Sequence, residues 1–512
     1  MKPAQSIDPI KSQIRNKLRR FRLDSILEVA MKLLHGEFDT PEQELQSLPW
    51  LMLLLVKWAL EDKMVHSNVG KAITPEELVE LQKLLWNSSG DARGANGLLT
   101  TNVVRYIRSI AYVQVQFQRS ETIDFVRWPA LIARLHPNHT LRKQFDAKFG
   151  LSPDDFLDMT LAVYARIMAG KEPLDEKFLS SMRVACGDKV DTLLGLLSRD
   201  VPALRALLGA EASQQRKTVA QEMLEFPVFK GFPLVRNPHG AYFTWHRKVF
   251  ARAVDEFIHT HLSPEGSDYA QPYGEIFERY VVELAKATSL DALDEKTFWN
   301  IVGKDKHAVE IILRDGESNV FVEAKFGVYQ DEYVTLDDTG YTKAKLTKLR
   351  DGVAKAADVS QRLSADARLA AFAARSEDFL LLVTNRHLHL PTGRQLETMS
   401  SEQFSTIDEG AKLVTTDKLP IENIFVLSLG EYESLMTVVA ERKVALAHLL
   451  KELAFDFREP STWRLDFSQM AAEKLHDKGL GIVTPQLLKA ATDRAMSRLA
   501  AALNEPEPGS LF

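Results

Sequence analysis

Two carboxylates and one ammonium lie close together in residues 308–326, a segment that reads as two β-strands joined by a tight turn. Glu310 stands in the first strand. Glu323 and Lys325 stand two residues apart in the second, so their side chains project from one face. The Asp315–Ser318 segment between the strands is typical of a hairpin turn. Carboxylates beside an amine suit a divalent cation and an attacking water, so the segment indicates metal-assisted hydrolysis.

Each of these residues also has an ordinary structural interpretation. Glu323 and Lys325 could form an ion pair on a solvated strand face, and Glu310 could simply point outward. The E-x-K triplet is common in charged proteins. The metal-site interpretation is favoured because the triplet lies on an apolar strand, thirteen positions after another strand-borne acid.

The elements around this segment predict a small mixed α/β sheet. A helix opens near Tyr273, and the pattern then predicts strands at 297–303, 307–314 and 319–327, helices at 342–364 and 365–375, and strands at 378–384 and 423–429. The step from the third strand through the long helix to the fourth is a crossover. It predicts that strands 319–327 and 378–384 are parallel, with a right-handed connection.

Helical periodicity dominates both ends of the chain. From about Phe21 to Glu225, apolar residues recur at three- and four-residue spacing, and helices resume from Glu431. Three prolines and two glycines in residues 226–243 mark a boundary. We therefore expect a helical N-terminal domain at 1–232, an α/β domain at 240–435 and a helical C-terminal region at 436–512.

Composition is that of a soluble globular protein, with 45% hydrophobic and 26% charged residues among 512. The single cysteine, Cys186, excludes an internal disulfide framework and suits a reducing cytosol. The most apolar run, Leu48–Leu60, contains Lys57 and is too short to span a bilayer, so it predicts a buried helix. With no secretory signal evident, we expect a cytoplasmic protein without membrane association. The sequence contains no P-loop motif, so nothing in it indicates ATP hydrolysis.

Net charge is −6, so nucleic-acid binding would need positive charge concentrated locally. Residues 11–22 hold six basic side chains and no acid, and a solvated helix face is the favoured interpretation there. A second basic run closely follows the carboxylate segment. At helical spacing, its members could contact a phosphate backbone, or equally form a solvated face; they are Lys343, Lys345, Lys348 and Arg350.

Residues 274–325 resemble the PD-(D/E)XK nuclease superfamily, which contains many restriction endonucleases and Holliday-junction resolvases. Gly274–Glu278 resembles the first helix of that family, whose inward glutamate approaches the metal. Glu310 stands where the family has its first acidic residue, and Glu323-Ala324-Lys325 matches the (D/E)-x-K element. The resemblance extends over about residues 272–385. It departs from the family at Glu310, which replaces the usual Asp, and at Val309, which replaces the usual proline.

The resemblance implies a role for each residue. Glu310, Glu323 and the carbonyl of Ala324 would bind Mg²⁺, with Mn²⁺ as the alternative ion, and Glu278 would bind a second metal or a metal-bound water. Lys325 would position or activate the attacking water. Gln361, on the later core helix, would have a supporting polar role. Cleavage in the family leaves a 5′-phosphate and a 3′-hydroxyl.

The expected fold is therefore a restriction-endonuclease-like α/β nuclease core with a mixed sheet, flanked by a large all-α N-terminal region and a smaller helical C-terminal region. The expected function is metal-dependent endonuclease cleavage of DNA in bacterial restriction or anti-phage defence, as a homo- or hetero-oligomer with a partner subunit. The residues do not distinguish DNA from RNA. A repair or recombination nuclease, or a non-catalytic nucleic-acid-binding assembly protein with this fold, are the alternatives.

Overall fold

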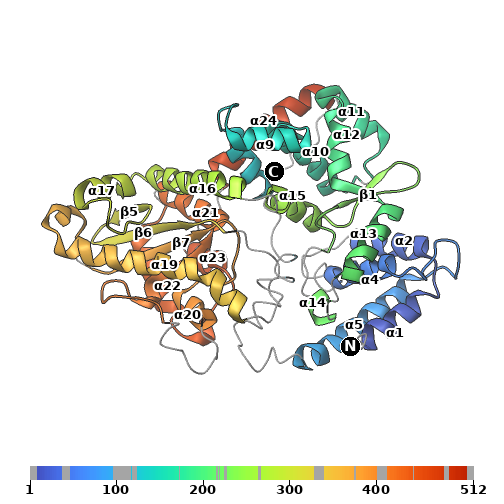
Figure 1. Ribbon diagram of the computed structural model, residues 1–512, viewed down its shortest axis with the longest axis horizontal. Coiled ribbons are helices and arrows are strands. Elements are labelled where there is room, and N and C mark those ends of the chain that lie inside the picture. Colours follow the sequence, from blue (N-terminus) through green and yellow to red (C-terminus); the bar gives the residue numbers. More distant parts are fainter. Residues whose placement is uncertain are drawn as a thin grey trace. The chain divides into compact units, whose positions relative to one another are not determined.

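A computed structural model places the chain in two compact units (Figure 1). The first unit comprises Met1–Leu99, Ser109–Leu262 and Gln486–Phe512, and the second comprises Thr100–Arg108 and Ser263–Pro485. The structure describes residues 9–36, 47–95, 113, 117, 124–171, 173–214, 217, 219–223, 228–262, 267–327, 339–373, 376–400, 412–441, 443–477 and 484–503. None of the helices in these ranges combines the length and the apolar character that a membrane crossing requires.

The first unit is built mainly from helices, as the periodicity predicts. They are α1 (Pro9–Leu18), α2 (Leu23–Leu34), α4 (Pro49–Glu61), α5 (Pro75–Ala95), α8 (Arg127–Ala133), α9 (Thr140–Phe149), α10 (Pro153–Met168), α11 (Glu176–Cys186), α12 (Lys189–Leu197), α13 (Val201–Gln214), α14 (Val219–Met223), α15 (Arg247–Leu262) and α24 (Gln486–Leu503). A small sheet of order β1-β2-β3 joins them, formed by Ser198–Asp200, Leu234–Arg236 and Tyr242–Thr244.

Two sequence features of the first unit have structural explanations. Helix α4 is buried along its whole length, which confirms the prediction of a buried helix for the most apolar run. The basic run at residues 11–22 is in part paired with buried acids. Arg15 and Arg19 donate to Asp62, and Lys11 donates to Glu222. These side chains therefore stabilise the helical packing.

The units divide the chain differently from the expected boundaries at 232 and 436. Helix α15 belongs to the first unit because Phe257 packs in an aromatic cluster, with its ring centroid 4.7 Å from that of Phe156. Residues 436–477 belong with the large sheet, where Phe467 packs against Phe425. Only the last helix, α24, returns to the first unit.

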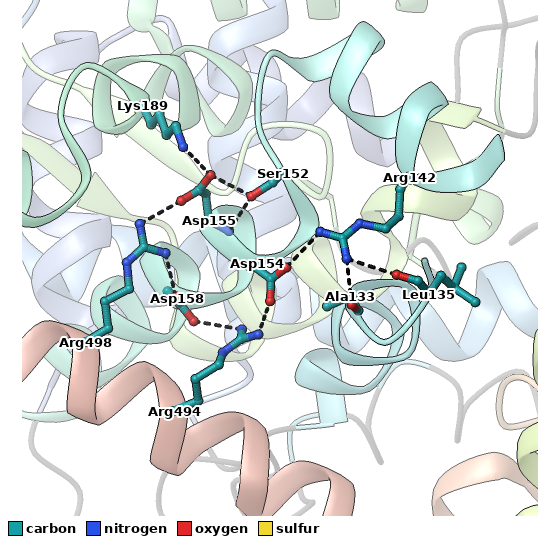
Figure 2. A network of polar contacts seen from close by, with 10 residues as sticks. All are labelled: Ala133, Leu135, Arg142, Ser152, Asp154, Asp155, Asp158, Lys189, Arg494 and Arg498. Atoms are coloured by element: carbon teal, nitrogen blue, oxygen red, sulfur yellow. Dashed lines mark hydrogen bonds and ion pairs between the residues drawn. The ribbon is translucent and has the colours of Figure 1, made fainter. Parts of the chain in front are cut away.

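Helix α24 is held against α10 by a network of ion pairs (Figure 2). Arg498 donates 2.7 Å bonds to Asp155 and to Asp158, and Arg494 donates a 3.0 Å bond to Asp158. Both aspartates are buried. Lys189 also pairs with Asp155. Since a buried carboxylate is costly without partners, the arginines of α24 are part of the folding energy of the first unit.

Replacing Arg498 with Met should therefore destabilise the first unit. Two buried carboxylates lose one partner each, while Lys189 and Arg494 still support them, so we expect a loss of about 1–2 kcal/mol in urea unfolding. Arg183→Met is the control, because it removes an arginine bound to the exposed acids Glu176 and Asp191. That control should lose less than about 1 kcal/mol. Equal losses in the two variants would contradict the importance of the α24 network.

The second unit contains a five-stranded mixed sheet of order β4-β5-β6-β7-β8. Its strands are β4 (Asp291–Asp294), β5 (Ile311–Asp315), β6 (Ser318–Lys325), β7 (Asp378–Thr384) and β8 (Ile424–Ser428). Its helices are α16 (Ser267–Ala287), α17 (Glu295–Val302), α19 (Thr339–Ala365), α20 (Gly393–Ser400), α21 (Leu429–Ala440), α22 (Leu446–Asp456) and α23 (Phe467–Asp477). Neighbouring strands are antiparallel from β4 to β6 and parallel from β6 to β8.

The hairpin and the crossover are confirmed. Asp315 pairs with Ser318 around a two-residue turn, and β6 lies parallel to β7 after the α19 crossover. The predicted strand at 297–303 is wrong, because those residues form most of helix α17. Asp294 caps that helix by accepting from the Thr297 amide, and the edge strand is instead β4. The predicted helix at 365–375 is a short 3₁₀ segment, Ala367–Phe372.

Helix α19 packs on one face of the sheet, across β6 and β7 (Figure 1). Gly352 makes the close approach: a Cβ there would meet Leu382 Cδ2 at 2.9 Å and Glu323 Cγ and Lys325 Cε at 3.2 Å. On the opposite face, the Phe425 ring of β8 lies 5.8 Å from the Phe467 ring of α23. Residues 323 and 325 of β6 therefore face α19.

Gly352→Ala should destabilise the second unit, although Ala is normally the better helix former. The added methyl has no room between α19 and the sheet, and we expect a loss of about 1–3 kcal/mol. Gly274→Ala is the matched control, because a Cβ there would make only ordinary contacts, at 3.8 and 3.9 Å, with Phe326. It should be neutral or stabilising by up to about 1 kcal/mol. Urea unfolding of the two variants compares them, and a stabilised Gly352→Ala would refute the close approach.

Candidate active site

The acids at the centre of the site are positioned by the β5–β6 hairpin. Glu323 lies in β6, and Glu310 is the residue immediately before β5. Since Ile311 pairs with Val322, one further step of the same register sets Glu310 opposite Glu323. The backbone carbonyl of Glu310 accepts a 3.1 Å hydrogen bond from the amide of Glu295, which ties the start of α17 to the hairpin.

Glu323 is completely buried. Its Oε1 accepts hydrogen bonds from Lys325 of the same strand and from Lys355 of α19, the latter at 3.2 Å. Its Oε2 is buried and has no hydrogen-bond partner within the described part of the chain. A buried carboxylate oxygen without a donor is costly, so this atom is a position where an additional cation or donor would stabilise the fold.

Three more glutamates lie around Glu323, and each has a raised pKa. Burial, followed by the charges of Glu323, Glu278 and Glu295, raises the pKa of Glu310 to about 8, against the opposing effect of Lys325. Burial is also the largest cause of the raised pKa of Glu278 on α16 and of Glu295 on α17. Glu323 raises both further. The site therefore holds more carboxylate than its surroundings neutralise.

Sequence reasoning missed two members of this cluster, Lys355 and Glu295. Glu295 lies at the start of helix α17, which the strand predicted at 297–303 conceals. Lys355 follows Gly352 by three residues, so helical spacing from that glycine could have found it. Burial lowers the pKa of Lys355, but Glu323, Glu310 and Glu295 raise it, and the net direction is upward.

The structure does not bring Gln361 to the cluster. Gln361 is exposed and stands nine residues after Gly352, which is about 180° around the helix from the sheet-facing side. Ala324 is buried in β6, with its side chain on the opposite face from Glu323. Of the expected basic group, Lys348 is exposed and Arg350 is partly buried on α19. The side chains of Lys343 and Lys345 lie outside the described residues.

The donor set suits a hard cation, although it is not already arranged around one. Among the described residues, no three His, Cys, Asp or Glu side chains stand in the geometry of metal ligands. Within the described ranges, however, the cluster contains four glutamates and two lysines, and one buried oxygen of Glu323 lacks a donor. Carboxylate oxygens are the donors that Mg²⁺ and Mn²⁺ prefer. Glu323, Glu310 and Glu278 are the residues that could hold such an ion.

A second polar group at this edge of the sheet has a structural role. Ser428 at the end of β8 lies 3.1 Å from Nε2 of His387, and Glu431 lies beside both. The group resembles a serine–histidine–acid arrangement, but Ser428 and Glu431 form the capping box of α21. Both oxygens of Glu431 accept backbone hydrogen bonds, from Ser428 and from Ser468. The serine is therefore committed to the helix start.

Comparison of the chain with protein-family models, with curated proteins and with solved structures gives no match. Similarity therefore assigns neither a family nor an activity.

Glu310→Gln should make stability less dependent on pH. The folded carboxyl titrates at about 8 and the unfolded one at about 4.5, so between these values the folded parent binds more protons and loses stability as pH rises. The amide cannot ionise. In metal-free buffer with EDTA, the variant should match the parent near pH 5 and exceed it by about 3 kcal/mol near pH 9. Urea unfolding across pH measures this, and a pH-independent difference would contradict the raised pKa of Glu310.

Proposed function

We propose that the second unit is the catalytic core of a metal-dependent nuclease that hydrolyses DNA phosphodiester bonds. One observation carries the proposal. Glu323 is fully buried near the end of an internal strand with Lys325 bound to it, while Glu310 and Glu278 add two further carboxyl groups from the neighbouring strand start and from α16. A purely structural ion pair needs neither the two extra acids nor an oxygen left without a donor.

The order of the elements supports the same proposal. Along the chain, α16 is followed by β4, then by the hairpin of β5 and β6, then by α19 and β7, with α17 inserted between β4 and β5 and a 3₁₀ segment between α19 and β7. This order resembles the core of the PD-(D/E)XK superfamily, and the E-x-K element lies on the third strand of the series. The resemblance covers only the second unit, so it gives no role to the first.

The proposed mechanism assigns each group to a step of in-line hydrolysis. Glu323, Glu310 and Glu278 would hold Mg²⁺ or Mn²⁺, together with the Ala324 carbonyl that the resemblance implies. A bound ion of this kind lowers the pKa of water and offsets charge on the reacting phosphate. Lys325, whose side chain is 15% exposed, presents an ammonium beside Glu323. It would orient the attacking water and stabilise the negative charge that develops. The products would carry a 5′-phosphate and a 3′-hydroxyl.

Helix α19 supplies a basic residue for the phosphate backbone next to this site. Lys348 is exposed and lies seven residues before Lys355, so the two share one side of the helix, about 10 Å apart along its axis. Contacts of this kind give affinity without sequence selectivity. We therefore assign binding of the DNA backbone to the basic run of α19, which comprises Lys343, Lys345, Lys348 and Arg350.

The cellular setting follows from the resemblance alone. We propose restriction or anti-phage defence in the cytoplasm, with a partner subunit or further copies of the chain, because superfamily members with long helical extensions commonly work in this way. Linear, supercoiled and junction DNA substrates would separate this setting from repair or recombination.

Glu323→Gln and Lys325→Met should each abolish most of the Mg²⁺-dependent nicking of plasmid DNA. Loss of a group that stabilises transition-state charge costs about 10²–10³-fold in rate. EDTA should stop the reaction of the parent. Lys348→Met is the comparison. It should weaken DNA binding similarly for all sequences and reduce the slope of log affinity against log salt concentration by about one. Turnover of bound DNA should stay intact. Undiminished cleavage by both site variants would overturn the proposal.

A further inference from the structure

Two ammonium groups share one oxygen of Glu323, and they differ in how firmly the fold holds them. Lys325 lies on the same strand as Glu323, and its side chain is 15% exposed. Lys355 arrives from α19, its Nζ lies 3.2 Å from Oε1 of Glu323, and its side chain is 35% exposed. Lys355 therefore has a route to solvent that does not disturb the strand.

The position of Lys355 is set by the packing of α19. Gly352 brings the helix so close to the sheet that a Cβ would lie 3.2 Å from both Glu323 and Lys325. Lys355 follows one turn later on the same side of the helix, so its amine reaches the same carboxylate. The contact thus depends on a flexible side chain anchored on a rigid helix.

The charges explain why a second ammonium is needed. Glu323 has no exposure, and Glu310 stands opposite it across the β5–β6 hairpin. Lys325 is its partner from the same strand. Without Lys355, this completely buried carboxylate would keep a single cationic partner among the described residues, which is costly for the folded chain.

We propose that Lys355 is a built-in counter-cation that neutralises Glu323 in the metal-free chain and withdraws when a metal binds the same carboxylate. The inference rests on the proposed function, because it takes Glu323 as a metal ligand. The competition is between two cations at one carboxylate: Lys355 lies 3.2 Å from Oε1, so its ammonium repels a metal that approaches the neighbouring Oε2, the atom that has no donor among the described residues. The metal affinity is then set by the difference between two free energies, that of the metal at the Glu323 carboxylate and that of the Lys355 ammonium at the same group.

The test is metal binding by the full chain in the absence of DNA. Isothermal titration with Mn²⁺ is measured for the parent and for Lys355→Met, which removes the competing charge and should bind about tenfold more tightly. Lys355→Gln is a second variant that removes the charge. Its amide can still donate a hydrogen bond to Glu323, so it keeps the test usable if Lys355→Met folds poorly. Lys355→Arg keeps a cation and should bind as the parent does.

Lys348→Met is the matched control, because it removes the same charge from the same side of α19, seven residues or about two turns before Lys355. Its Mn²⁺ affinity should stay within about twofold of the parent, since exposed charges at that distance are screened. Glu323→Gln should abolish binding. In the metal-free state, thermal unfolding should show a lower Tm for Lys355→Met than for Lys348→Met, because only the former strips a partner from the buried acid.

The outcomes separate the two proposals. Tighter binding in both Lys355→Met and Lys355→Gln, with Lys348→Met unchanged, supports the counter-cation. Parent binding that depends on Glu323 but is unchanged or weaker in the Lys355 variants overturns the inference and leaves the metal site standing. Absence of Glu323-dependent Mn²⁺ binding in the parent and in all variants overturns both.

Discussion

The burial of one charged carboxylate is the constraint on which the second unit depends. Strand β6 is covered on both faces and is buried from Ser318 to Ala324, and Glu323, two residues before its end, has no exposure. A charge in such a place must be paired. The two lysines bound to it, and the glycine that lets α19 approach, are the response of the surrounding structure to that requirement.

The same constraint links stability to function. Glu310, Glu278 and Glu295 are held near Glu323 although each has its pKa raised and is therefore disfavoured as an anion. A fold selected only for stability would replace these acids with apolar residues of similar volume. Groups whose ionisation is strongly perturbed by burial and by one another are typical of sites that bind or react, because function requires a strained charge distribution.

The sequence was sufficient for the centre of the site and for the topology next to it. The hairpin, the parallel crossover and the residues Glu310, Glu323 and Lys325 could all be predicted, because strand alternation determines which side chains share a face. Helix α17 could not, because the apolar residues of 297–303 fit either element, and the cap at Asp294 decides the matter. The return of α24 to the first unit depends on ion pairs between residues more than 300 positions apart, which no local pattern encodes.

Gln361 and Lys355 show where prediction from motif order ends. Both are polar residues on the helix that follows the E-x-K strand, and motif order alone does not rank them. The rotation of α19 about its axis decides which of the two residues faces Glu323, and Gly352 fixes that rotation. Gly352 marks the line of closest approach to the sheet, because any side chain there would collide with Leu382. A residue three positions later lies beside that line, whereas one nine positions later lies about half a turn away, in solvent. Helical phase measured from the contact glycine therefore selects Lys355 and excludes Gln361 from direct contact with Glu323.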